Sequence, residues 1–328
     1  MRNRKKKNRF LFFGFISLLT AGVVSFSVKN SVESRVSTFT MNEWAIGIYT
    51  GSSPLNLSDP PQINNPVITA ADVTDIKADF VADPFMIQVD SRWYMFFEVL
   101  NSLTNQGDIA LAKSADGFNW EYDRVVLDEP FHLSYPLVFE YRGEYYMIPE
   151  SAEASELRLY RALDFPYGWE FERTMIEGEF GDHVLFEHDQ SWWIIANSSP
   201  YTHDNTRLFF ADSLKGEWTE HPMSPIVIDD ASRARPGGRV PMLDNSIFWL
   251  AQDCKPTYGR KLNAFEIVKL TREVYKERPY DGNPVLRPGQ ESWRRRGMHH
   301  IDAHLIGDDE WIACVDGYRR NLFIRFEY

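Results

Sequence analysis

The fold can be inferred from the stretch DPFMIQVDSRWYMFFE, residues 83–98, because its pattern returns four more times along the chain. It consists of a short apolar strand, a polar turn and an aromatic-rich strand that ends in a polar residue. The related segments begin at Tyr135, Asp182, Arg235 and His299. Two short strands around a turn of this kind predict a β-hairpin.

A second hairpin follows each of the first three, and a tryptophan lies in or just after its turn, at Trp120, Trp169 and Trp218. These tryptophans recur at intervals of about 50 residues, which is the period of a repeat protein. Four strands per repeat, without a strong helical stretch, is typical of a propeller blade. The sequence therefore predicts an all-β, five-bladed β-propeller.

The fifth repeat is incomplete, because only one more strand, residues 321–328, follows Asp316. A ring of blades usually closes by taking a strand from the other terminus, and Trp44–Tyr49 is a suitable apolar run. We therefore expect residues 44–328 to form the propeller domain, with the Pro- and Asn-rich residues 52–66 as a loop.

The N-terminal 30 residues contain seven basic side chains and no acidic one, and residues 10–28 carry no charge. A helix of that length would span roughly 28 Å, close to the hydrocarbon thickness of a bilayer. Residues 1–30 are thus expected to be an uncleaved signal anchor or a cleavable signal peptide, with Ser25-Phe26-Ser27 as a possible cleavage site.

A Ser/Thr-rich tether would follow at residues 31–43, with residues 31–41 as a loop. The basic cluster favours a cytoplasmic N-terminus. The propeller would then lie outside the cytoplasm, in a periplasmic, extracellular or Golgi-lumenal space, anchored to the membrane or secreted after cleavage.

Charge and cysteine content exclude some classes of protein. Acidic residues outnumber basic ones, 47 against 35, so the chain would repel a polyanion and nucleic-acid binding is not expected. The two cysteines, Cys254 and Cys314, are too few for a disulfide scaffold or a zinc cluster. They could form one disulfide or remain as two buried thiols.

Polar residues recur at the strand ends that should surround the central channel. In a propeller, the first strand of each blade starts on the face where the second ends, which places Asp83, Asp182 and Arg235 on one rim. The ends of the second strands would join them: Glu98, Glu150, Asn197, Asp253 and Asp316. A plain alternative is that strand ends are polar because they meet turns.

Clustered carboxylates suit chemistry at glycosidic bonds. One carboxylic acid protonates the leaving oxygen, and a second carboxylate activates water or attacks directly. Crowding raises the pKa of at least one such acid and keeps it protonated near neutral pH. Carboxylates also bind sugar hydroxyls without any catalysis, so this pattern leaves both roles open.

Two further clusters have open interpretations. His299, His300 and His304 with Asp302 could hold a metal, or could bond hydroxyls and water. The arginines near Gly237-Gly238 could bind a phosphate or a sugar carboxylate, or could balance the acidic rim. We expect no cofactor and no catalytic metal, with a structural cation near His299 and His300 as the one possibility.

Several motifs occur in an order that resembles a known domain: Asp83-Pro84-Phe85, Phe131–Pro136, Ile148–Ser151 and Gln252-Asp253-Cys254. From Trp44 to the C-terminus the chain resembles the N-terminal domain of glucosamine inositolphosphorylceramide transferases. That domain is similar to the five-bladed arabinanase, levansucrase and invertase superfamily of glycoside hydrolases. The transferase domain of the plant proteins has no counterpart here.

The resemblance assigns roles to particular residues. Asp83 matches the superfamily nucleophile or base of blade one. Tyr135 stands where blade two carries a second Asp, and Asp182 stands where blade three carries a Glu acid. These departures make Glu150 the better candidate acid. A superfamily histidine of blade five, sometimes near a cation, is matched by His299 or His300.

Together these arguments predict a glycoside hydrolase-like or transglycosidase propeller. The alternatives are a non-catalytic carbohydrate-binding domain that serves polysaccharide or glycolipid glycosyl transfer, and a protein-interaction propeller. The expected ligand is a carbohydrate or glycolipid. The predicted catalytic residues are Asp83, Glu150 and Asp182. The predicted substrate-binding residues are Glu98, His132, Tyr135, Asn197, Arg235, Gln252, Asp253, His299, His300 and Asp316.

Overall fold

The computed structural model describes residues 35–327, which are almost entirely β-strand and loop with three short 3-10 turns. The predicted anchor or signal segment lies outside the described residues. Within 35–327, no helix has the length and apolar character needed to cross a bilayer. Residues Glu43–Arg319 form one compact unit, and the strand ends outside these bounds form a second.

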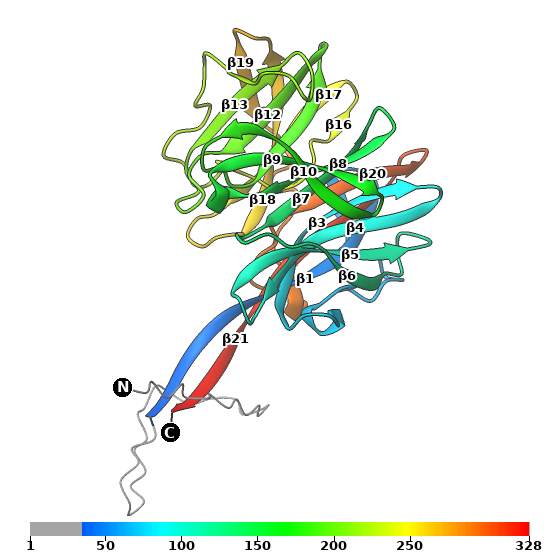
Figure 1. The fold of residues 1–328 in the computed structure, drawn as a ribbon, viewed down its shortest axis with the longest axis vertical. Helices are drawn as coiled ribbons and strands as arrows, with labels where there is room; N and C mark the ends of the chain where they lie inside the picture. Colours follow the sequence, from blue (N-terminus) through cyan, green and yellow to red (C-terminus); the bar gives the residue numbers. More distant parts are fainter. Residues whose placement is uncertain (1–34, 328) are drawn as a thin grey trace, which may run out of the picture. The chain divides into compact units, whose positions relative to one another are not determined.

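Five antiparallel sheets follow one another along the chain and confirm the predicted five-bladed propeller (Figure 1). Blade one contains β3 Ala78–Val89, β4 Arg92–Asn101, β5 Gln106–Ser114 and β6 Glu121–Leu127. Blade two contains β7 Ser134–Tyr141, β8 Glu144–Glu150, β9 Glu156–Asp164 and β10 Tyr167–Glu177. Blade three contains β11 His183–His188, β12 Ser191–Asn197, β13 Thr206–Ala211 and β14 Thr219–Glu220.

Blade four has an interrupted innermost strand. Its members are β15 Arg235–Pro236, β16 Met242–Leu243, β17 Ser246–Asp253, β18 Lys261–Leu270 and β19 Tyr275–Pro279. Both β15 and β16 pair with β17. The interruption contains Gly238, where an added Cβ would lie 1.7 Å from the carbonyl oxygen of Ile301. Only glycine allows the innermost strands of blades four and five to approach this closely.

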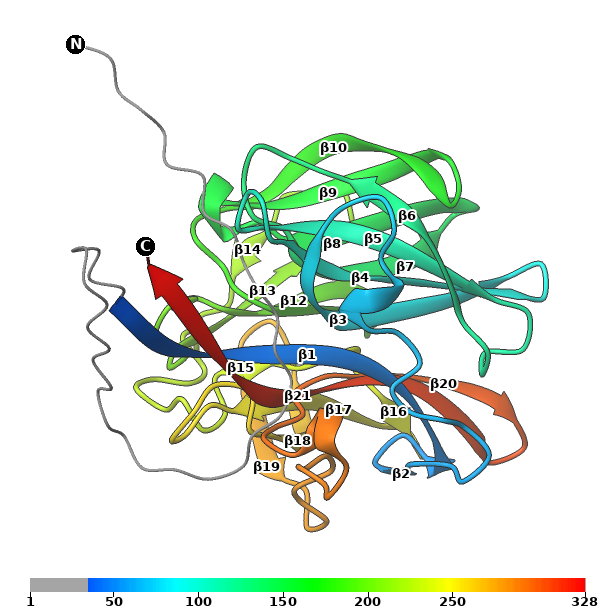
Figure 2. The same cartoon turned by 90° about the horizontal axis from the view of Figure 1, so that it is seen from below.

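Blade five joins the two ends of the chain. Its strand order is β2-β1-β21-β20, and Figure 2 shows β1 in blue beside β21 in red. The strands are β1 Arg35–Ser53, β2 Asn56–Ser58, β20 Ile301–Gly307 and β21 Glu310–Glu327. The predicted strand Trp44–Tyr49 is therefore part of β1 and completes the last blade.

Three local expectations about blade five are wrong. Residues 321–327 continue β21 instead of forming a separate strand, and the N-terminal side contributes a second strand, β2, inside the expected loop 52–66. Residues 35–41, expected as a loop, begin β1. Their Ser/Thr content suggested a tether, but alternating Val, Thr and Phe favour a strand once a partner is available.

Tight turns set the hairpin register in the first four blades. Asp90-Ser91, Arg142-Gly143, Asp189-Gln190 and Asp244-Asn245 all have positive φ at both positions. This is the two-residue turn whose twist matches that of paired strands. The second strand of each of these blades is buried along most of its length.

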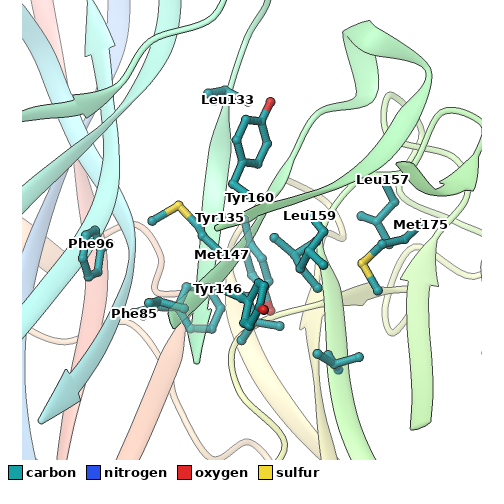
Figure 3. Packing of buried hydrophobic residues seen from close by; sticks show 14 of the residues in the cluster. Phe85, Phe96, Leu133, Tyr135, Tyr146, Met147, Leu157, Leu159, Tyr160 and Met175 are labelled. Atoms are coloured by element: carbon teal, nitrogen blue, oxygen red, sulfur yellow. The ribbon is translucent and has the colours of Figure 1, made fainter. Parts of the chain in front are cut away.

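Aromatic side chains fill the space between neighbouring blades. Between blades one and two, the rings of Phe85 and Tyr135 meet edge-on with centroids 4.8 Å apart, and Figure 3 shows them among Met147, Tyr146 and Leu159. Phe85 and Tyr135 are fully buried. Truncating such an aromatic to alanine typically costs about 3–5 kcal/mol, so this packing holds the inner strands in place.

Candidate functional site

The two strands that carry Asp83 and Tyr135 are locally distorted at these residues. Both residues have positive φ, 53° and 48°, and each precedes a proline. The pairing register shifts at the same places, between Ala82 and Phe85 and between Ser134 and Leu137. Such conformations cost about 1–3 kcal/mol and concentrate at functional sites, where they redirect side chains.

Arg235 at the start of β15 connects two of the predicted acids. Its Nε and Nη2 donate to the two carboxylate oxygens of Asp182, at 2.7 and 2.9 Å, and Nη2 also donates to Glu150 at 2.7 Å. All three side chains are at most 10% exposed. Gln252 donates to Asp182 as well. Blades two, three and four thus meet in one buried ionic network.

The other donors of Arg235 are also satisfied inside the protein. Nη1 donates to the carbonyl oxygen of Pro200 and to Nδ1 of His203, both at 3.2 Å. A guanidinium can only donate, so Nδ1 of His203 is an acceptor and the ring is neutral. Burial, reinforced by Arg235, lowers the pKa of His203 to about 4, in agreement with this geometry.

Asp83 meets blade five on the opposite side of the network. Its backbone N–H donates to Asp316 at 3.1 Å, and Asp316 lies 2.8 Å from Nδ1 of His299. The Nδ1 atom of His299 is also 3.8 Å from Asp83. Ligand atoms of these three residues lie within 4.8 Å of one another, so they could hold a cation. The histidine set predicted with Asp302 does not form this group, because Asp302 pairs with Arg239 and His304.

Burial and pairing shift the pKa values of the four acids in two directions. Burial raises the pKa of Glu150 to about 8, although Arg235 opposes the shift. Burial, with the nearby charges of Asp182 and Asp316, raises the pKa of Asp83 well above its usual range. Burial also acts to raise the pKa of Asp182, but Arg235 and the hydrogen bond with Glu150 together lower it. The pKa of Asp316 is lowered in the same way, against burial, by His299, His300 and the backbone N–H of Asp83. The pKa values of Glu150 and Asp83 are thus raised, whereas those of Asp182 and Asp316 are lowered.

Glu98 and His132 form a separate pair. The backbone N–H of Gly107 donates to Nδ1 of His132 at 3.0 Å, which leaves Nε2–H to face Glu98 at 3.3 Å. The side chain of His132 is 30% exposed, whereas that of Glu98 is 7% exposed. This pair is more accessible to a ligand than the ionic network around Arg235.

Other predicted residues hold the surrounding structure. The hydroxyl of Tyr135 accepts from Gly238 N at 2.5 Å, which joins blades two and four. Asn197 donates to the carbonyl oxygens of Asn205 and Ala234 and so fixes the loop that carries His203. Asp253 contacts Lys261 at 3.3 Å.

The centre of the ring holds two neutral histidines. Both ring nitrogens of His183 and of His300 are buried and lack a hydrogen-bond partner among the described residues, as does Oδ1 of Asp83. Burial lowers the pKa of each histidine to about 4. The two cysteines are buried free thiols, so of the two alternatives for them the structure supports the unpaired one.

Three neighbours of the site were not predicted from the sequence. The indole of Trp44, from β1, stacks on His299 with centroids 3.9 Å apart. The ring of Tyr258 lies edge-on to the same imidazole, with centroids 5.2 Å apart, and its centroid is 5.3 Å from Cζ of Arg235. The third neighbour is His203, which contacts Arg235. All three lie in loops or at the far terminus, where the repeat pattern carries no signal; only the neighbouring Gly259, at φ +64°, marks the Tyr258 loop as a special turn.

Fold and site together define the class of protein: a five-bladed β-propeller with a cluster of buried acids at its inner strand ends. A thermostable family-43 glycoside hydrolase superposes with a TM-score of 0.57 at 14% identity, over 81% of this chain and 96% of that one. The β-1,2-mannobiose phosphorylase from Listeria innocua superposes with a TM-score of 0.60 at 13% identity, over 82% and 96%. At these identities the likeness concerns the fold alone.

The chain belongs to the family described as glucosamine inositolphosphorylceramide transferase 1, N-terminal, whose model matches residues 40–318. Glucosamine inositolphosphorylceramide transferase 1 of Oryza sativa subsp. japonica is 40% identical over 299 residues, 84% of this chain and 40% of that protein. The protein of the same name from Arabidopsis thaliana is 35% identical over 297 residues, 84% and 39%. The chain thus spans about two-fifths of the length of these relatives.

Proposed function

We propose that the propeller is a carbohydrate-binding domain that holds a sugar or glycolipid headgroup at the acid cluster. The observation that carries this proposal is the meeting of four acids from different blades around Arg235 and His299. A sugar hydroxyl both donates and accepts hydrogen bonds. A carboxyl whose pKa is raised, as in Glu150, can donate to such a hydroxyl when it is protonated, whereas a carboxylate can only accept.

The ionised acids are poorly suited to attack a sugar. Asp182 is held by Arg235 and Gln252, and Asp316 by His299 and the backbone of Asp83. Burial, with the charges of Asp182 and Asp316, raises the pKa of Asp83, the expected nucleophile or base, which disfavours the ionised form that attack requires. Acids held in place by protein partners favour recognition, and Arg235 is the positioning residue that holds Asp182 and Glu150.

A second candidate function is action on a glycosidic bond, with Glu150 as general acid. The observation in its favour is the pKa of about 8 for Glu150, which keeps this carboxyl protonated at the working pH of a general acid. In this case water or a second substrate would attack the sugar. Asp83 would be the base that activates this attacking group, and it would have to be ionised to do so.

The relatives' printed names support a glycolipid as the ligand, since they refer to transfer onto inositolphosphorylceramide. With residues 10–28 as a membrane anchor, the propeller would hold such a headgroup close to the bilayer, outside the cytoplasm. Nucleic acid is not a partner in this proposal, because the chain is acidic overall.

A glycan array probed with the purified full-length chain tests the proposal, followed by product analysis of each hit. We expect Asp83→Asn and Glu150→Gln to weaken binding by about tenfold or more, the cost of one or two hydrogen bonds to a buried acid. Asp308→Asn and Glu187→Gln, at exposed positions, are the matched controls.

The two candidate functions differ in whether the bound glycan is converted into a product. Turnover of a bound glycan that falls about a hundredfold in Glu150→Gln would establish catalysis. Binding that persists unchanged in both cluster variants would place the carbohydrate site elsewhere and overturn the assignment.

A further inference from the structure

A crevice of about 630 Å³ lies on the outer part of the ring, between blades two and three, away from the acid cluster. Its walls come from β10 and from the turn before β14. The lining side chains include Arg173, Met175, Ile176, Lys215, Glu217 and Trp218. The volume falls in the range of small-molecule sites, which runs from about 300 to 1,000 Å³.

The tryptophans of two equivalent turns differ in their surroundings. Trp169 and Trp218 occupy these turns, and each indole N–H donates to a turn carbonyl, of Pro166 and of Leu214. In blade two, Phe165 and Phe96 pack against Trp169, which is only 7% exposed. Four residues before the tryptophan, where blade two has Phe165, blade three has Leu214. Trp218 is half-buried and lines the crevice.

The groups around the crevice suit a neutral, hydroxyl-rich ligand. Because the N–H of Trp218 is already bonded, the indole offers its apolar ring. Arg173 is oriented by the carbonyl oxygens of Thr174 and Lys215, and Lys215 pairs with Glu172 at 2.7 Å. Two exposed acids, Glu177 and Glu217, lie at the rim. The opposite charges balance, so neither an anion nor a cation is favoured.

We propose that this crevice is a second carbohydrate-binding site, which takes a neutral saccharide with one sugar face on the indole of Trp218. The apolar C–H face of a pyranose would cover the ring, while Arg173, Glu177 and Glu217 bond its hydroxyls. The inference rests on the proposed function for its ligand class, but it uses none of the acid-cluster residues.

Fluorine NMR on the full-length chain labelled with 5-fluorotryptophan tests the proposal. The resonance absent from Trp218→Phe identifies Trp218. The probes are β-1,2-mannobiose, cellotriose and arabinotriose, each titrated into the parent and the variants. We expect at least one probe to shift the Trp218 resonance in the parent and in Glu150→Gln alike, which separates this site from the acid cluster.

Two variants remove the site in different ways. Trp218→Ala deletes the platform, and Ile176→Trp keeps an apolar side chain and fills the crevice, so one remains informative if the other misfolds. Both should weaken binding of the shifting probe by roughly tenfold or more. Trp120→Ala, in the equivalent turn of blade one, is the matched control. A Trp218 resonance that no probe moves, or binding retained in Ile176→Trp, would overturn the proposal.

Discussion

Arg235 carries five N–H donors, and each has a partner inside the protein. A side chain so fully bonded sets the positions of its neighbours and has no donor left for a ligand. Its removal would leave the buried Asp182 carboxylate without a counter-charge and Glu150 without its hydrogen-bond donor. Breaking a buried ion pair on one side is costly for this reason.

We therefore expect Arg235→Met to reduce the free energy of unfolding by about 3–5 kcal/mol at pH 7. The loss should shrink at pH 5, because Asp182 without Arg235 takes up a proton more readily. Urea unfolding at both pH values measures the effect. Arg233→Met, which removes a half-exposed arginine paired with Glu277, should cost less than about 1 kcal/mol. Equal losses for the two arginines would contradict the role given to Arg235.

The raised pKa of Glu150 predicts how stability depends on pH. A carboxyl whose pKa is about 8 in the folded state binds more protons there than in the unfolded chain. Its contribution to stability is therefore present at acidic pH and is lost as the pH rises from about 4.5 towards 8. Asp83 acts in the same direction.

Glu150→Gln mimics the protonated acid, so its melting temperature should fall less than that of the parent between pH 5 and pH 8, by several degrees. Thermal melting in matched buffers provides the comparison, with Glu187→Gln as the control. Parallel melting curves for Glu150→Gln and the parent across this range would mean that Glu150 is ionised throughout.

The sequence predicts the acids better than it predicts their surroundings. Asp83, Glu150, Asp182 and Asp316 were found because repeat positions place them at equivalent strand ends. Their pairing with Arg235 and His299 depends on side-chain directions set by the distorted strands of blades one and two. Neighbours such as Trp44 and Tyr258 come from segments without a period, so only the folded chain reveals them.

Among the elements, β1 contributes most to the closure of the propeller ring. It supplies the third strand of blade five, and its Trp44 stacks on His299 and meets Tyr318 at a tilt of 40°, with centroids 4.5 Å apart for the latter. The strand therefore closes the sheet and also forms part of the site. The pairing was predictable because the fifth repeat lacked strands, but the contribution of β2 was not, since three residues carry too little pattern.

Deleting residues 42–50 should prevent cooperative folding, because β21 would be left with an unpaired edge. Circular dichroism melting of the deletion variant is the measurement. A peptide of residues 42–59 added in excess should restore part of the transition. A deletion variant that melts like the parent would show that the ring closes without β1.

For the whole molecule, the uneven distribution of charge predicts its orientation at a membrane. Six basic residues precede the uncharged run 10–28, and the rest of the chain is acidic. A reporter fused after Tyr328 should therefore be active only if it is a type that works outside the cytoplasm. Paired phosphatase and cytoplasmic reporters test this, and activity of the cytoplasmic one would reverse the proposed orientation.

The partnership of β1 and β21 also fixes the order of events during synthesis. Glu43 and Arg319, bonded to each other across these strands, are 276 residues apart in the chain. At about 5–20 residues per second, the ribosome needs on the order of tens of seconds to produce the second strand after the first. Blades one to four can assemble in turn during this interval, whereas β1 must wait with its apolar residues uncovered. Factors that shield nascent chains should therefore act on the N-terminal strand first and release it last.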